Sequence, residues 1–130
     1  MTVAEIVQRY RRVAVVGLSP NPKRPSNFVS IYLMNNGFDV TPVNPGHKSI
    51  LGRPCYPSLA EVPGPIDIVD VFREPSALPA IAEQAVAAGA KVLWMQSGIV
   101  NEEAAEIARR GGLDVVMDRC LKIEHATHVR

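Results

Sequence analysis

The feature that most constrains the fold of this chain is a regular alternation of short apolar segments with helical ones. Strands separated by helices run parallel and are covered by helices on both faces of the sheet. The predicted strands are 13–18, 38–43, 66–72, 91–95 and 113–117, and the predicted helices are 2–10, 27–36, 75–88 and 101–110, with a short helical turn allowed at 59–62. We therefore predict a doubly wound, Rossmann-like α/β fold with a five-stranded parallel sheet in the order 3-2-1-4-5.

Local signals support several of these elements. Thr2 and Glu5 have the spacing of a capping box at the start of the first helix. Glu102 and Glu103 stand in the first turn of the last predicted helix, where negative charge is favourable. Pro42 is awkward for a central strand because proline has no N–H to donate, so we expect the pairing of 38–43 to loosen there.

Size, charge and cysteine content limit the classes of function. A chain of 130 residues suits one domain over 1–130, and a net charge of +1 gives no overall field to attract nucleic acid or an acidic membrane. Cys55 and Cys120 are too few for a disulfide framework. Residues 1–10 lack a signal-peptide pattern, and no apolar run approaches the roughly 20 residues of a membrane helix. We expect a soluble, cytoplasmic protein.

The ligand site is expected where the strands end. Open parallel sheets bind ligands outside the carboxyl ends of their strands, at the point where the strand order reverses, which the predicted order places between strands one and four. The polar or loop residues that follow these strand ends are Gly17, Ser19, Lys23, Arg24, Ser26, Val43, Asn44, Pro45, Gly46, His47, Lys48, Phe72, Arg73, Gln96, Ser97 and Gly98.

Four cations among these residues indicate an anion site. Lys23, Arg24, Lys48 and Arg73 all lie on loops at the same predicted edge. The helix that begins near residue 27 also points its positive dipole end there, and Ser26 is placed to cap it or to donate a hydroxyl. A single exposed cation is usually only solvated, but the convergence of four in a chain with almost no net charge favours an anion site.

The sequence disfavours NAD as the anion. A Gly-x-Gly-x-x-Gly fingerprint would open at Gly17, but Ser19 breaks it. The acid that would bind the ribose belongs at the carboxyl end of strand two. Asp39 instead opens that strand, and Asn44 stands at its end. Asn44 and Lys48 would tolerate a ribose 3′-phosphate that an acid would repel.

Several short segments, in this order and spacing, resemble a known family. The chain resembles the small stand-alone CoA-binding proteins, which are similar to the CoA-binding domain of the succinyl-CoA synthetase alpha subunit. The resemblance runs from about residue 13 to residue 125, and the segments that carry it are 15–26, 40–46, 51–59, 67–73, 89–98 and 118–125.

The resemblance implies coenzyme A as the ligand and assigns parts of it to the strand ends. The nucleotide end would lie across the exits of strands one and two, with Phe72 and Arg73 flanking the adenine or the pantetheine arm. Arg24 would hold a phosphate in a bidentate manner and Lys23 as a point charge. The remaining contacts that the resemblance implies are Gly17, Leu18, Ser19, Ser26, Asn44, Pro45 and Gly46 for the nucleotide, and Met95, Gln96 and Ser97 for the pantetheine.

Departures from the synthetase limit this inference. The ligase domain that supplies its phosphorylated histidine has no counterpart here, His125 and His128 do not match it, and prolines 20, 22 and 25 replace its glycine-rich loop. We therefore carry over no ligase activity and identify no catalytic residue. The first hypothesis is a protein that binds CoA or an acyl-CoA without chemistry of its own. The alternatives are a small enzyme that uses NAD(P) or an acyl-CoA, and an interaction subunit; self-association stays open.

The cysteines and histidines give weaker signals. The spacing of Cys120, His125 and His128 matches no zinc pattern, and a fourth ligand is missing. A buried core cysteine followed by histidines of the tail is the simpler interpretation. Cys55 as a thiol that forms a mixed disulfide with CoA is disfavoured, because its activation would need a nearby cation or helix end.

Overall fold

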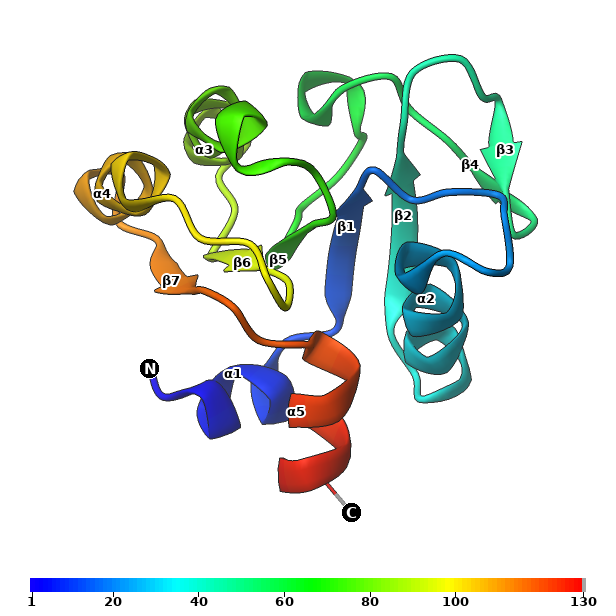
Figure 1. The fold of residues 1–130 in the computed structure, drawn as a ribbon, viewed down its shortest axis with the longest axis horizontal. Helices are drawn as coiled ribbons and strands as arrows, with labels where there is room; N and C mark the ends of the chain where they lie inside the picture. Colours follow the sequence, from blue (N-terminus) through cyan, green and yellow to red (C-terminus); the bar gives the residue numbers. More distant parts are fainter. Residues whose placement is uncertain (130) are drawn as a thin grey trace.

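A five-stranded parallel sheet forms the middle layer of the computed structural model, which describes residues 1–129 (Figure 1). The strands pair in the order β2-β1-β5-β6-β7, and every pairing is parallel. The predicted fold class is therefore confirmed. The strands are β1 (Arg12–Val16), β2 (Asp39–Val43), β5 (Ile68–Val71), β6 (Val92–Met95) and β7 (Asp114–Val116).

The position of one strand differs from the prediction. The predicted order placed segment 66–72 outside strand two, whereas β5 lies between β1 and β6. The burial of all four β5 residues suits an interior strand. The edge position of β2 in turn suits Pro42, because β2 pairs in the sheet only with β1 and proline is best tolerated on an edge strand. The strand order therefore reverses between β1 and β5, not between strands one and four.

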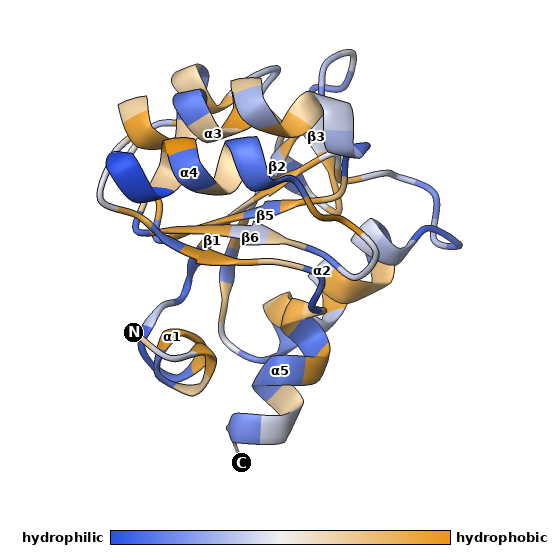
Figure 2. Ribbon diagram, turned by 60° about the vertical axis from the view of Figure 1, so that its left-hand side comes forward, coloured by the Kyte–Doolittle hydropathy of each residue, from blue (hydrophilic) through white to orange (hydrophobic). Residues whose placement is uncertain are grey.

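Helices cover both faces of the sheet, as Figure 2 shows. One face carries α3 (Leu78–Ala87) and α4 (Glu102–Arg110), which pack against each other. The opposite face carries α1 (Val3–Arg9), α2 (Pro25–Asn35) and α5 (Leu121–His128). Short 3₁₀ helices lie at Leu59–Glu61 and Pro75–Ala77. Within residues 1–129, every helix is too short or too polar to serve as a membrane span.

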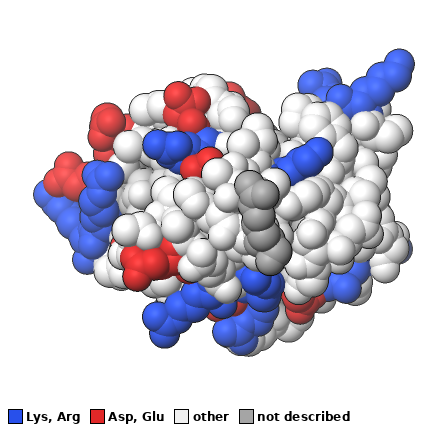
Figure 3. Space-filling view, turned by 90° about the horizontal axis from the view of Figure 1, so that it is seen from below, with Lys and Arg blue, Asp and Glu red and all other residues white. Residues whose placement is uncertain are grey.

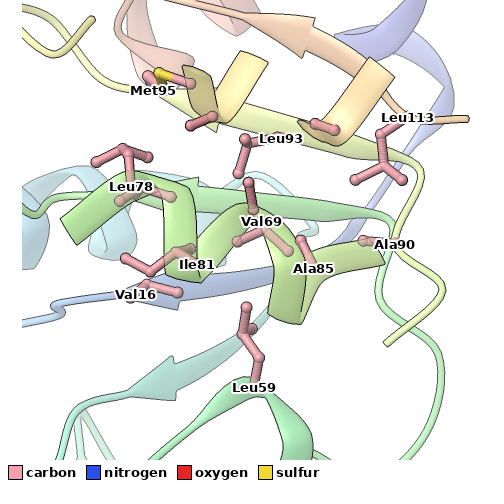
Figure 4. Close-up of a cluster of buried hydrophobic side chains, with 14 of the residues drawn as sticks. Val16, Leu59, Val69, Leu78, Ile81, Ala85, Ala90, Leu93, Met95 and Leu113 are labelled. Atoms are coloured by element: carbon pink, nitrogen blue, oxygen red, sulfur yellow. The ribbon is translucent and has the colours of Figure 1, made fainter. Parts of the chain in front are cut away.

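Alternating strand residues divide the core into two. In β1, Val13 and Val15 pack into the core beneath α1, α2 and α5, and Ala14 and Val16 pack into the core beneath α3 and α4. Figure 4 shows the second of these cores, in which Val16 and the corresponding residues of β5 and β6 meet side chains of α3. Both faces are buried, which explains why the strands are nearly continuous apolar runs.

Two elements were not predicted. Residues assigned to a turn-rich connection form the small hairpin β3 (Ser49–Ile50) and β4 (Arg53–Pro54). Residues assigned to a tail form α5. In that helix His125 is buried, and its Nδ1 lies 2.8 Å from the Tyr32 hydroxyl of α2. Burial, together with the charge of Arg11, holds the pKa of His125 below its usual value.

The contact between α3 and α4 generates a stability prediction. A Cβ on Gly111, at the end of α4, would lie 2.4 Å from Val86 Cγ2, although its backbone has an ordinary negative φ. We expect Gly111→Ala to lower the free energy of unfolding by about 1–3 kcal/mol through overpacking. Urea unfolding measures the change. The double variant Gly111→Ala/Val86→Ala should lose less stability than the sum of the losses in the two single variants, because the smaller side chain at position 86 makes room for the new Cβ. Losses that simply add would contradict this explanation.

Candidate ligand-binding site at the carboxyl edge of the sheet

The exit of β1 is held against the exit of β5 at Gly17. The φ angle of Gly17 is +87°, and a Cβ there would lie 2.8 Å from the carbonyl oxygen of Phe72. Its N–H donates to the carbonyl of Val43 at 2.8 Å, which ties the exit of β2 to the same point. Only glycine satisfies both the backbone angle and the close approach. The exits of β1, β2 and β5 consequently converge on Gly17.

The loop after Gly17 is fixed to the first turns of α2. The N–H of Ser19 donates to Ser26 Oγ at 2.9 Å, and Asn27 Nδ2 donates to the carbonyl of Ser19 at 2.9 Å. The prediction that Ser26 caps α2 was wrong: the N-cap is Arg24, Pro25 begins the helix, and the Ser26 hydroxyl accepts from the loop instead. Proline fixes the backbone angle of the first helical position, so the start of α2 lies upstream of the predicted one.

A pocket of about 720 Å³ opens where the strand order reverses. The exits of β1, β5 and β6, the start of α2 and the start of α5 form its walls. The predicted site residues that line it are Gly17, Ser19, Arg24, Ser26, Phe72, Arg73, Gln96 and Ser97. Lining residues that the sequence did not predict are Pro25, Phe28, Val29, Glu74, Pro75, Ile99, Cys120 and Ile123.

A second pocket of about 470 Å³ adjoins the first and shares Gly17 and Arg73 with it. It also contains Val43, Asn44 and Pro45, the predicted residues of the β2 exit. Asn44 Nδ2 donates to the carbonyl of Leu18 at 2.8 Å and so holds the loops after β1 and β2 together. The two pockets thus flank Gly17 and Arg73, which line both of them, and together they make up the candidate site.

The structure does not bring the other predicted residues into these pockets. The side chains of Leu18 and Met95 are fully buried in the two cores, so only their backbone can face a ligand. Lys23, Gly46 and Lys48 are exposed outside both pockets. Contact between these three residues and a ligand stays a prediction.

The charges of the site are local. Arg24 and Arg73 line the larger pocket, and Arg73 also pairs with Glu74, with Nη2 to Oε1 at 3.0 Å. The hydrogen bond from Arg73 lowers the pKa of Glu74. The ion pairs within residues 1–129 do not include Arg24. Of the two arginines in the larger pocket, Arg24 is therefore the one whose charge is not already paired with a carboxylate.

The start of α2 contributes fewer amide donors than its position suggests. Pro25 has no N–H, and the N–H groups of Asn27 and Phe28 donate to the carbonyl of Arg24. Ser26 is left as the residue of the first turn whose N–H has no partner within the helix. The cationic side chains and the helix dipole, more than a row of amides, provide the attraction for an anion.

Away from this edge the charges are mixed. Figure 3 views the molecule from the side of α1 and α5, and shows Lys and Arg side chains spread around the rim of this face with Asp and Glu among them. Arg12 and Asp67 form one such pair at the amino edge of the sheet, with Nη2 to Oδ1 at 3.0 Å. Burial alone would raise the pKa of Asp67, but the hydrogen bonds from Arg12 and Arg11 outweigh it and hold that pKa below its usual value.

Cys120 differs from its predicted role, whereas Cys55 agrees with the expectation for it. Cys120 is half-buried and lines the larger pocket instead of sitting in the core. Cys55 is buried, its thiol contacts the Asn44 carbonyl at 3.4 Å, and burial raises its pKa, all of which disfavour a reactive thiolate. Within the described residues, no group of three or more His, Cys, Asp or Glu side chains is placed to hold a metal ion.

A family comparison identifies the class of protein to which this site belongs. The sequence model of the CoA binding domain matches residues 11–126, which include every strand and every helix except α1 and the last two residues of α5. The chain belongs to this CoA-binding domain family. Both pockets lie within the matched residues.

Relatives of this CoA-binding domain occur both alone and within larger enzymes. The uncharacterized protein YneT of Bacillus subtilis is 46% identical over 124 residues, which cover 95% of this chain and 92% of YneT. A hypothetical protein from Pyrococcus horikoshii has a solved structure with a TM-score of 0.95 and 43% identity, over 98% of this chain and 90% of that one. The ADP-forming acetate–CoA ligase I of Archaeoglobus fulgidus is 30% identical over 119 residues, 84% of this chain but only 17% of the ligase.

These relatives refine the resemblance drawn from the sequence. The enzyme among them is named as an acetate–CoA ligase, whereas the sequence suggested the succinyl-CoA synthetase alpha subunit. The family itself is the predicted one.

The carboxyl group of Asp70, two residues before Phe72, is buried at a cost in folding free energy. Asp70 stands two residues after Ile68 in β5, so its side chain points to the same face of the sheet as Ile68, towards the layer of α1, α2 and α5. It is fully buried, and neither carboxyl oxygen has a hydrogen-bond partner in the described part of the chain. Ser30 Oγ and Asn27 Oδ1 of α2 are buried without partners in the same way. Burial raises the pKa of Asp70 well above its usual value.

This raised pKa predicts a specific dependence of stability on pH. The folded protein binds the Asp70 proton more tightly than the unfolded chain, so its stability falls as pH rises from the usual aspartate pKa towards the raised one. Asp70→Asn removes this effect. We expect the stability of the variant relative to the wild type to grow by about 1.4 kcal/mol per pH unit across that window.

Urea unfolding at several pH values between 4 and 7 measures the difference. Glu83→Gln, at an exposed position of α3, is the matched control and should follow the wild type. Parallel stability curves for Asp70→Asn and the wild type would contradict a raised pKa of Asp70.

Proposed function

We propose that this protein binds coenzyme A across the two pockets that flank Gly17. The nucleotide end lies across the exits of β1 and β2 with its phosphates towards Arg73 and Arg24, and the pantetheine arm runs on through the larger pocket towards Ser97. The observation that carries the proposal is that Arg24 and Arg73 line one pocket at the reversal of the strand order, in a chain of the CoA-binding domain family.

The chemistry of the ligand matches the chemistry of the site. Coenzyme A carries a pyrophosphate and a ribose 3′-phosphate, and guanidinium groups bind phosphate through charge-assisted, bidentate hydrogen bonds. Among residues 1–129, Arg24 forms no ion pair with a carboxylate, which suits it to this role. The exit of β2 carries Asn44 where an acid would repel the 3′-phosphate, and the exposed Lys48 follows it.

The proposal is limited to binding. The acetate–CoA ligase of Archaeoglobus fulgidus shares only 17% of its length with this chain, and its reaction belongs to the whole enzyme. We assign no catalytic step to the residues of this chain. Protein partners and self-association are left to experiment.

Ligand selectivity is the first test. We expect coenzyme A to raise the melting temperature when its concentration is well above its Kd, because a ligand that binds only the folded state stabilises it. Dephospho-CoA should have a smaller effect, since it lacks the 3′-phosphate, and NAD should have none. Thermal-shift measurements with the three nucleotides provide the comparison. Stabilisation by NAD alone would favour the NAD(P)-dependent alternative. A stoichiometric protein partner with no nucleotide effect would favour the interaction subunit.

The role of Arg24 is the second test. We expect Arg24→Ala to weaken the binding of coenzyme A by about 1–3 kcal/mol, the range for a hydrogen bond to a charged group. Isothermal titration calorimetry measures the change. Lys91→Ala is the matched control, because Lys91 is an exposed cation at the amino edge of the sheet, next to the start of β6. An unchanged affinity in Arg24→Ala would remove this residue from the site.

A further inference from the structure

The larger pocket has one polar wall and one apolar wall. Its polar wall includes Arg24, Arg73 and Ser97, at the start of α2 and at the exits of β5 and β6. Its apolar wall is formed by Phe28 of α2 and Ile123 of α5, and Ile99 after β6 adds apolar surface elsewhere in the lining. The ligand that fills this pocket must therefore combine an anionic or polar part with an apolar part.

The apolar wall lies along the contact between α2 and α5. Lys122 Nζ of α5 lies 5.9 Å from the centre of the Phe28 ring and 5.5 Å from that of Tyr32, and the Tyr32 hydroxyl is bonded to His125. These contacts hold Phe28 and the neighbouring Ile123 at one end of the pocket. The two helices are tied to each other independently of any ligand, so the apolar wall is already formed.

The apolar wall is unusually exposed. Phe28 is 45% exposed and Ile123 is 59% exposed, although both residues have large apolar side chains. The other large apolar residues exposed within residues 1–129 are outside this pocket: Met1, Ile31 and Val100. A protein partner would need a wide contact face, of about 800 Å² on each partner. Two exposed side chains inside the mouth of a pocket fit a narrow apolar tail better.

We propose that this apolar wall binds the acyl chain of an acyl-CoA thioester, with a preference for chains longer than acetyl. The inference rests on the proposed function, because the pantetheine arm must first run past Ser97 to bring the thioester to the wall. The acyl chain then covers Phe28 and Ile123, while Arg24 and Arg73 hold the polar part of the same molecule. Each fully buried methylene strengthens binding about fourfold, so even partial burial of a medium-length chain gives a measurable preference.

Calorimetric titration with coenzyme A, acetyl-CoA and octanoyl-CoA tests the proposal. We expect octanoyl-CoA to bind at least about tenfold more tightly than acetyl-CoA, and acetyl-CoA to bind about as tightly as coenzyme A. Octanoyl-CoA should also compete with coenzyme A for a single site. The measured quantity is the ratio of the octanoyl-CoA to the acetyl-CoA affinity within each protein.

Two matched substitutions locate the effect. In Ile123→Asn the ratio should fall towards one, because the amide removes the apolar surface at the end of the pocket. Val100→Asn alters another exposed apolar residue, outside the pocket, and should leave the ratio as in the wild type. Circular dichroism spectra and melting curves establish that both variants are folded before the ratios are compared. A variant that fails to fold is replaced by Phe28→Asn for the pocket or Ile31→Asn for the control.

The outcomes separate this inference from the proposed function. Equal affinities for coenzyme A, acetyl-CoA and octanoyl-CoA would overturn the acyl-chain site and leave the proposal of CoA binding intact. No binding of any of them would overturn both. A dimer that dissociates in Ile123→Asn, together with a ratio near one in the wild type, would overturn the proposal by showing that a second copy of the chain covers the wall.

Discussion

The contact between Gly17 and the carbonyl of Phe72 determines how the carboxyl edge is arranged. A side chain at position 17 would meet that oxygen at 2.8 Å, so only glycine lets the exits of β1 and β5 lie against each other. The strand order reverses between these two strands, and a doubly wound sheet offers a crevice at such a point. Gly17 borders both pockets, and its N–H also holds the exit of β2. One close backbone contact thus sets the shape of the candidate site.

The site combines strong local charge with a protein that is nearly neutral. Arg24 and Arg73 stand in the larger pocket, and the rest of the surface carries mixed signs. Attraction of a phosphate group therefore depends on short-range contacts and not on the field of the whole molecule. Beside the site, Asp70, Ser30 and Asn27 carry buried polar atoms without partners. Burial without a hydrogen-bond partner costs stability and raises the pKa of Asp70 well above its usual value.

Much of the fold was predictable because its signals are local. Apolar runs and caps placed every strand of the main sheet and helices α1 to α4 within about three residues, and the Thr2–Glu5 capping box is present as expected. The missed elements have weak local signals. Helix α5 has only two large apolar residues, Leu121 and Ile123, and the β3–β4 hairpin has two residues in each strand. The site was predictable in part, because a doubly wound sheet brings the carboxyl ends of its strands to one edge, and Gly17 follows the first of them.

The sequence by itself determined the fold class, and it indicated the edge of the sheet that carries the candidate site and the two arginines that line its larger pocket, because hydrophobic periodicity, glycine and charge are properties of neighbouring residues. Only the tertiary structure decided which strands are adjacent, that Leu18 and Met95 are buried, and that Ile123 closes a pocket begun by Gly17. These features depend on residues far apart in the sequence, such as Val13 and Ile68 in adjacent strands or Gly17 and Ile123 in one pocket. Their contacts arise from packing between layers, and no local pattern in the chain encodes them.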